Sequence, residues 1–398
     1  MMSSVRTLRQ AVMPIVWLNC IFCMGIFEIP IKRPRYFLSA FYAITILTGY
    51  FVLICKEIHI FQKILIQEFV VFYFALGVNI FVAVLAVIQF WRKTEKVDNI
   101  IKRSSMADDT LEALGIKSEY QKTFRNILVI VVIWIVGMLT LIVIYVTFMY
   151  RDVKQWDLIS TNICICFPIV MNSVVDLTFS SLISCVQMKF QKINTLTNNA
   201  VVYVNESKIF KIHNRYDKTS VAFVMANYKN DKDKVMRLIQ TLRHLHLECT
   251  RIARHINRSY CVLLLLELAV HFTVVTTNAY CLYRAFFGQL SITVTNEQII
   301  TMSVSACIYS FKIILINWLC TCVSTEAYKT GEIIQSIEGS IMDDDMREEI
   351  HQFAQQIVLN ELKFTATGFF TIDNTLTGKF FATVATYVVI LIQINTSI

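Results

Sequence analysis

Four ionisable side chains stand well inside long apolar stretches of the 398-residue chain: Asp176, Glu267, His271 and Lys312. A fifth, Lys379, lies close to the start of another such stretch. Glu267 and His271 are four residues apart, so a helix places them on one face. Lys312 is expected to approach one of these two, because its stretch runs in the opposite direction. Ionisable groups inside a membrane are costly and mark functional sites by default. The four residues predict either a polar core that couples a ligand to a gate or a structural ion pair.

The chain lacks the common sequence signatures of catalysis. It has no phosphate-binding loop, no G-x-S-x-G and no HExxH. The densest group of metal-binding residue types is His244, His246, Cys249 and His255, whose spacing fits no standard zinc pattern. Most of the 12 cysteines fall in or beside apolar stretches, where cysteine behaves as a small hydrophobe. No enzymatic activity, cofactor or bound metal is therefore expected.

The elements that carry the ionisable groups belong to a set of seven apolar stretches. Hydrophobic residues make up 56% of the chain and charged residues 17%, against about 45–50% and about 25% in soluble domains. Each stretch provides the roughly 20 apolar residues that a helix needs to cross a bilayer. They are residues 36–55, 69–91, 127–150, 158–188, 260–283, 298–324 and 374–394. The sequence predicts an all-α polytopic membrane protein with seven transmembrane helices.

Basic residues predict the orientation of these spans. Segments 1–35, 92–126, 189–259 and 325–373 carry 30 of the 37 Lys and Arg residues, and the segments on the other side carry 5. Basic loops stay cytoplasmic, so the N-terminus is predicted inside and the C-terminus outside. Because orientation explains the net charge of +8, nothing supports nucleic-acid binding.

The segments predicted to lie inside also contain helical patterns. Residues 11–27 are apolar but short and flanked by basic residues, so they predict a re-entrant or membrane-surface helix within an N-terminal region 1–35. Residues 236–247 are amphipathic and predict a long extension of span five within loop 189–259 of the 36–324 bundle. Acidic residues at 343–345 predict the start of a helix that continues toward Phe364, in region 325–373.

Polar and aromatic residues gather in the predicted outer halves of spans two to six. Small-molecule pockets combine an apolar, aromatic lining with a few polar groups. The alternative is an interfacial aromatic belt with hydrogen bonds between helices. The candidate pocket residues are Tyr73, Phe74, Tyr145, Thr161, Asn162, Thr276, Asn278, Tyr280, Thr301 and Ser305.

The C-terminal segment resembles a known signature. Residues 386–394 read Thr-Tyr, five hydrophobic residues, Gln and Ile, and residues 368–373 read Gly-Phe-Phe-Thr-Ile-Asp. Both stretches are similar to the end of insect gustatory receptors, in which phenylalanine stands where this chain has Ile394. The number of spans and the predicted orientation agree with that family over nearly the whole chain.

The resemblance implies a ligand-gated, non-selective cation channel. It implies a homo- or heterotetramer of gustatory receptor subunits in the plasma membrane of a sensory neuron dendrite, permeable to monovalent and divalent cations. Region 325–373 would anchor the subunits in the cytoplasm, and span 374–398 would line the pore. Val388 stands where sugar receptors tend to carry an acid, which favours a bitter or other non-volatile tastant and leaves fructose-like, thermal or light responses open. The implied pore and gate residues are Gln393, Ile394, Ile390, Tyr387, Thr386 and Thr383.

Two other classes of membrane protein remain as alternatives. The first is a seven-helix receptor without channel activity, either of inverted topology or G-protein-coupled. A G-protein-coupled receptor predicts an N-terminus outside the cell, and the Asp-Arg-Tyr and Asn-Pro-x-x-Tyr signatures are absent. A small-solute transporter predicts internal repeats and helices broken near the midplane. No repeat is evident, and Pro168 is the only proline within a predicted span.

Overall fold

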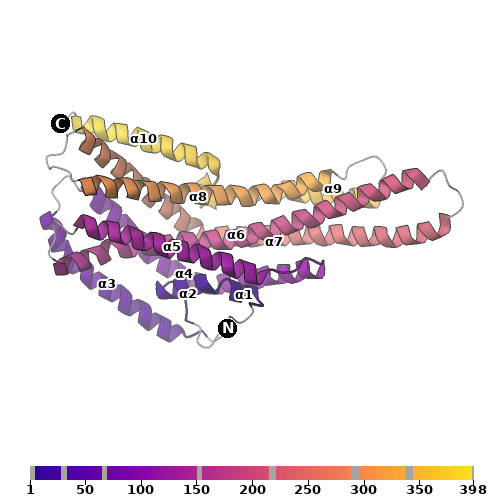
Figure 1. Ribbon diagram of the computed structural model, residues 1–398, viewed down its shortest axis with the longest axis horizontal. Helices are drawn as coiled ribbons and strands as arrows, with labels where there is room; N and C mark the ends of the chain where they lie inside the picture. The colour runs from indigo at the N-terminus through magenta and orange to yellow at the C-terminus, as the bar shows by residue number, and fades with distance from the viewer. Residues whose placement is uncertain are drawn as a thin grey trace.

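The computed structural model describes residues 5–27, 34–64, 70–149, 155–214, 221–287, 296–336 and 344–396. Within these ranges the chain is almost entirely helical, with one short β-hairpin (Figure 1). The elements are α1 (Leu8–Ala11), α2 (Met13–Ile21), α3 (Tyr36–Ile64), α4 (Val70–Ala113), α5 (Tyr120–Met149), α6 (Gln155–Asn214), α7 (Val221–Phe286), α8 (Asn296–Gln335), α9 (Asp344–Leu359), β1 (Thr365–Ala366), β2 (Phe370–Thr371) and α10 (Asn374–Thr396). Seven of these helices, α3 to α8 and α10, are long and apolar enough to cross a membrane. The seven-helix prediction is confirmed.

Several of these helices continue far beyond the apolar stretches. The 60 residues of α6 and the 66 residues of α7 correspond to about 90–100 Å of helix at 1.5 Å per residue. Their extensions run side by side past the other helices, at the right of Figure 1. On the α7 extension Ile239 and Leu242 are fully buried while Arg237 faces solvent. The predicted helical extension of span five is therefore present.

The N-terminal segment forms two short helices. With nine residues, α2 is too short to cross a bilayer. The segment packs against the long helices instead: Trp91 donates its indole N–H to the Cys23 carbonyl at 2.8 Å, and Asn19 donates to Thr178 at 3.0 Å. A side chain at Gly25 would lie 2.6 Å from the Cys20 sulfur, so the turn after α2 requires glycine. This segment agrees with the prediction that residues 11–27 do not span.

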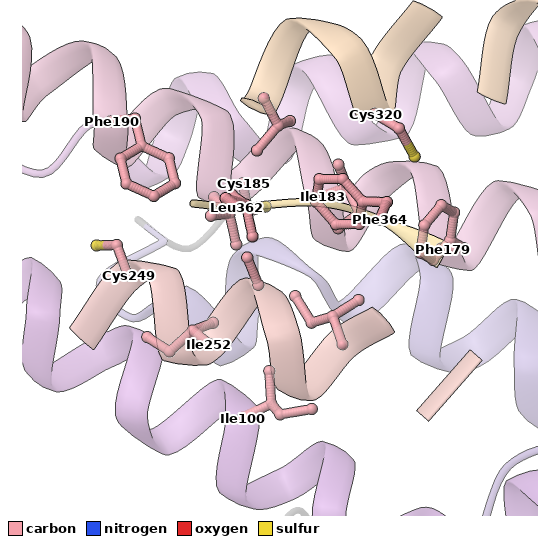
Figure 2. Packing of buried hydrophobic residues seen from close by; sticks show 14 of the residues in the cluster. Ile100, Phe179, Ile183, Cys185, Phe190, Cys249, Ile252, Cys320, Leu362 and Phe364 are labelled. Atoms are coloured by element: carbon pink, nitrogen blue, oxygen red, sulfur yellow. The ribbon is translucent and has the colours of Figure 1, made fainter. Parts of the chain in front are cut away.

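The largest apolar core lies where α6 and α7 meet the segment after α9. Figure 2 shows Phe190 of α6, Ile252 of α7 and Phe364 among the buried residues of this core. All three are at most 2% exposed. A second, smaller cluster joins α7 and α8 to Phe380 and Val384 of α10. The helix α10 therefore attaches to the bundle through a limited apolar contact.

The connection from α9 to α10 contains the hairpin. The helix α9 begins at Asp344, with two acids in its first turn as expected, but it ends at Leu359. The prediction that it continues to Phe364 was wrong. The all-α class is confirmed, but the sequence did not predict the short strands β1 and β2. Strands of two residues are too short to show an alternating pattern. The turn between them uses Gly368 at φ +82°, a conformation that glycine adopts without strain.

Candidate functional site

A small cavity lies among α4 to α8, near the end of the bundle where α5, α7 and α10 finish. Its volume is about 40 Å³, enough for one or two water molecules. Three of the predicted pocket residues line it, Tyr145 of α5, Asn278 of α7 and Ser305 of α8. Asn278 donates its amide to the Ser305 hydroxyl at 3.2 Å, and Tyr145 also hydrogen-bonds Ser305. These bonds join three helices at the wall of the cavity.

The same cavity has polar and aromatic walls that the sequence analysis did not single out. They are Asn79 of α4, Thr277 of α7 and Tyr309 of α8. Asn79 also accepts a hydrogen bond from Asn172 of α6 at 3.2 Å. Asn79 and Thr277 are ordinary polar residues inside spans, and only their positions relative to Asn278 and Ser305 set them apart. Sequence spacing within a single helix does not reveal such a grouping.

The other predicted pocket residues do not line this cavity. Thr161 is buried against α3, where it donates to the Glu57 carboxylate at 2.7 Å, and Ser160 donates to the other oxygen of Glu57. Asn162 is buried and accepts a hydrogen bond from the Cys166 thiol. Phe74 is 63% exposed, and the Arg284 guanidinium lies over the Tyr280 ring. The Tyr73 side chain is outside the described residues, and Thr276 and Thr301 are buried in α7 and α8.

Glu57 is a functional candidate that the sequence analysis missed. It follows the apolar stretch 36–55 closely and is fully buried. A buried carboxylate needs hydrogen-bond donors, and Ser160 and Thr161 supply them. The signal in the sequence was an acid directly after a span, opposite two adjacent hydroxyl residues on another span.

The four ionisable residues that the sequence places well inside the apolar stretches meet in one polar cluster. We use this name for Asp176 of α6, Glu267 and His271 of α7, and Lys312 of α8. The Lys312 Nζ lies 3.3 Å from Asp176 Oδ2, and His271 Nε2 lies 4.0 Å from the same oxygen. The sequence predicted Glu267 or His271 as the neighbour of Lys312; its ion pair is with Asp176. Ligand atoms of Asp176, Glu267 and His271 lie within 4.8 Å of one another.

Tyr309 connects the polar cluster to the cavity. Its ring packs edge-on against His271, with centroids 5.3 Å apart, and the Lys312 ammonium lies 5.5 Å from the centre of the same ring. Because Tyr309 also lines the cavity, a molecule bound there would contact a side chain that touches the polar cluster.

On its other side, the polar cluster approaches α10. Glu267, His271 and Asn317 line a second cavity of about 10 Å³. Asn317 of α8 donates its amide to the Thr377 hydroxyl of α10 at 2.8 Å. Asp373 accepts the backbone N–H groups of Thr375 and Leu376 at 2.9 and 3.1 Å, and so caps the start of α10. The start of α10 is thus held by specific polar contacts.

The predicted gate residues lie on the exposed part of α10. Tyr387 is half exposed, and its ring packs edge-on against Phe272 of α7 with centroids 5.4 Å apart. The hydroxyls of Thr383 and Thr386 donate to carbonyls of their own helix. The remaining three predicted gate residues, Ile390, Gln393 and Ile394, are also exposed in the single chain.

A larger cavity lies near the N-terminal segment. It has a volume of about 720 Å³ and is lined by α1 and α2 together with parts of α4, α6 and α7. Its walls are mainly apolar, and the charged residues Arg9 and Asp98 are among its lining. Tyr260, 2% exposed between Phe90 and Phe179, also lines it. This cavity is separate from the predicted pocket.

The dispersed His/Cys group of the α7 extension does not form a metal site. His246 bonds the Ala327 carbonyl at 3.0 Å, and Cys249 is buried in the apolar core. His244 and His255 face solvent. Within the part of the chain that the structure describes, the one group with metal-binding geometry is Asp176, Glu267 and His271.

Comparison with known proteins identifies the family. Residues 16–398 match the family model described as "7tm Chemosensory receptor". The chain belongs to this family. This 7tm chemosensory receptor is therefore a multi-pass membrane protein of a receptor family, rather than an enzyme.

Curated relatives of this receptor are gustatory receptors of Drosophila melanogaster. The chain is 31% identical over 150 residues to "Gustatory and pheromone receptor 32a", covering 37% of this chain and 32% of the relative. It is 21% identical over 310 residues to "Putative gustatory receptor 28b", covering 76% of this chain and 65% of the relative. The matched regions thus span about a third and just under two thirds of these two relatives. The resemblance to gustatory receptors is confirmed.

Solved structures share the fold of this receptor. The insect olfactory receptor OR5 from Machilis hrabei aligns with a TM-score of 0.70 at 12% identity, covering 97% of this chain and 98% of that chain. The OR5 structure in complex with eugenol aligns with a TM-score of 0.65 over the same shares. At this identity the likeness establishes the seven-helix architecture alone.

Proposed function

We propose that this receptor is a gustatory receptor that works as a ligand-gated, non-selective cation channel. A small non-volatile tastant binds in the cavity lined by Tyr145, Asn278 and Ser305. Four subunits, identical or mixed with other gustatory receptors, place their α10 helices around a central pore. Channel opening then depolarises a sensory neuron, with monovalent and divalent cations permeating.

The observation that carries this proposal is the surface of α10. Of the seven candidate spans it is the least buried. In its most apolar 18-residue stretch 11% of the residues are buried by the rest of the chain, against 83% for α6. Its uncovered residues include the charged Lys379 as well as apolar side chains. A charged side chain is costly in lipid, so this surface suits other subunits and an aqueous pathway. Gln393 would offer an amide to a hydrated cation, and Ile394 an apolar constriction that gates by dewetting.

A route for coupling the ligand to the pore also supports the proposal. Tyr309 contacts both the cavity and the polar cluster. Beyond the cluster, Asn317 donates to Thr377 of α10. A ligand that displaces Tyr309 would change the packing of His271 and Lys312, and the start of α10 would respond. For this to bias the channel, the ligand must bind the open arrangement more tightly than the closed one.

The volume and the polar lining of the cavity restrict the kind of ligand that can bind there. At about 40 Å³ it is far smaller than the roughly 300–1,000 Å³ of typical small-molecule sites. The surrounding helices must therefore move apart to admit a tastant. Its hydroxyl and amide groups favour a compact molecule with hydrogen-bonding groups over a purely apolar one. Together with Val388, this favours a bitter or similar non-volatile compound.

The proposed orientation places the N-terminus in the cytoplasm and the C-terminus outside. The support is the distribution of Lys and Arg between the two sets of loops. Epitope tags on each terminus in unpermeabilised cells provide the test. Surface labelling of a C-terminal tag alone fits the channel, whereas labelling of an N-terminal tag would favour a G-protein-coupled receptor.

The channel is tested by recording ligand-evoked currents. A calcium-imaging screen of bitter compounds, sugars and other tastants identifies an agonist, and patch-clamp recording then gives the reversal potential. We expect a reversal potential near zero in mixed-cation solutions. Gln393→Ala should alter permeation or gating with normal surface expression. Val143→Ala, on an exposed apolar face of α5, is the matched control and should change neither; unchanged currents in Gln393→Ala would contradict the placement of α10 at the pore.

A further inference from the structure

The polar cluster contains two acidic side chains, Asp176 and Glu267, and one strongly basic side chain, Lys312. Asp176 and Glu267 carry two negative charges when ionised, and Lys312 carries one positive charge. The other titratable groups are His271 within the cluster, Tyr309 of α8 against it, and Tyr145 of α5 and Cys166 of α6 beside Tyr309. All are neutral in their ordinary forms at neutral pH. With the carboxylates ionised, one negative charge has no counterpart among the described residues. An uncompensated charge in a membrane interior is expensive.

Several buried polar atoms at the same place have no hydrogen-bond partner. Glu267 is 2% exposed, and neither of its carboxylate oxygens has a hydrogen-bond partner. The same holds for His271 Nε2 and for Asn317 Oδ1, in side chains that are at most 1% exposed. Buried polar groups are normally satisfied, and each exception needs an explanation.

All of these unpartnered atoms can act as acceptors. The His271 ring bonds the backbone carbonyl of Glu267, and the unbonded ring atom is Nε2. The proton therefore lies on Nδ1, and Nε2 presents a lone pair. Carboxylate oxygens, an imidazole lone pair and an amide oxygen together favour a positively charged ligand.

We propose that Asp176, Glu267 and His271 bind one monovalent cation of the sodium class. Because their ligand atoms lie within 4.8 Å of one another, a single ion at their centre is at most about 2.8 Å from each, near hydrogen-bonding distance. A zinc ion needs contacts of about 2.0–2.2 Å and would require the three groups to contract. A single positive charge neutralises the cluster, whereas a divalent ion would leave a net positive charge beside Lys312.

The neighbouring cavity completes the site. At about 10 Å³ it accommodates one water molecule, and Glu267, His271 and Asn317 line it. A water there would coordinate the ion and donate to Asn317 Oδ1. The other end of Asn317 holds Thr377 of α10 at 2.8 Å. Occupancy of the site therefore stabilises the observed contact between α8 and α10.

The test measures sodium binding to the purified full-length receptor and requires no recording of ionic currents. Its outcome is therefore independent of whether the receptor conducts ions. The unfolding midpoint is followed while Na⁺ replaces N-methyl-D-glucamine at constant ionic strength. We expect a saturable rise of about 3 °C or more. Glu267→Gln should abolish the rise and should itself raise the midpoint in sodium-free buffer, because it removes the uncompensated charge.

The matched control is Glu57→Gln, a buried carboxylate that already has hydroxyl partners; it should keep the sodium response. His271→Asn should weaken the response and serves if Glu267→Gln does not fold. Equal midpoints in both salts would overturn the proposal. A midpoint that responds to acidification and not to Na⁺ would overturn it in favour of a proton, and a response to Zn²⁺ alone would overturn it in favour of a divalent site.

Discussion

The helices α6 and α10 are both long and apolar enough to span a membrane, but the rest of the chain covers them to different extents. In the most apolar 18-residue stretch of each helix, 83% of the residues of α6 and 11% of those of α10 are buried. The bundle surrounds α6, whereas α10 lies along one edge against α7 and α8 (Figure 1). The folding of α6 is thus supported within one chain. Most of the surface of α10 is left to lipid, water or other chains.

The helix α5 provides a comparison for the exposed surface of α10. In its most apolar stretch only 22% of the residues are buried, and the exposed large side chains there are mainly Val, Ile and Leu. Its exposed threonines, Thr140 and Thr147, bond their own helix. That surface suits lipid. The exposed surface of α10 adds the charged Lys379, so the two poorly buried helices differ in the polarity of the surface that the chain leaves uncovered.

Breaking the polar cluster should have the largest effect on stability. Lys312→Met removes the partner of Asp176 and leaves two buried carboxylates together. The loss of a buried ion-pair partner costs about 3–5 kcal/mol, so we expect strongly reduced surface expression and a lower unfolding midpoint. The double variant Lys312→Met, Asp176→Asn should recover much of the loss. If the single variant is as stable as the wild type, the cluster contributes nothing to the bundle.

A matched pair of isoleucines tests the comparison between α6 and α10 directly. Ile183 of α6 is fully buried and Ile390 of α10 is 41% exposed. Replacing a buried isoleucine by alanine costs about 2–5 kcal/mol, so Ile183→Ala should lower the unfolding midpoint markedly. Ile390→Ala should change it little in a dissociated subunit. A larger loss for Ile390→Ala in the assembled receptor than in separated subunits would show that partners cover this surface.

The sequence predicted the helices better than the contacts between residues of different helices. Seven spans, the α7 extension and the start of α9 follow from patterns within one segment, because apolar length and period are local properties. The sequence placed Asp176 among four ionisable residues without naming its partner, because its ion pair with Lys312 depends on how α6 packs against α8. Of the ten candidate pocket residues, Tyr145, Asn278 and Ser305 line one cavity, while Thr161 bonds Glu57 on α3 instead.

The contact between α8 and α10 should have an intermediate effect. Thr377→Val removes the hydroxyl that accepts from Asn317 and leaves a buried amide N–H without a partner, at a cost of about 1–3 kcal/mol. We expect a lower unfolding midpoint and an altered agonist response. Thr377→Ser keeps the hydroxyl and should behave as the wild type. Identical behaviour of the Val and Ser variants would show that this bond does not hold α10.

The smallest effect is expected at the cap of α10. Asp373→Ala removes the acceptor of the Thr375 and Leu376 N–H groups and should cost about 1 kcal/mol. Partial burial opposes ionisation, but hydrogen bonds from Thr375, Thr371 and the backbone outweigh it and lower the pKa of Asp373. A carboxyl group whose pKa is lowered by folding stabilises the folded state fully at pH values above its unfolded pKa of about 3.9. This stabilisation disappears as the pH falls through the folded-state pKa.

The difference in unfolding midpoint between wild type and Asp373→Ala should therefore be constant near neutral pH and shrink in acid. A difference that grows in acid would mean that another group holds the start of α10.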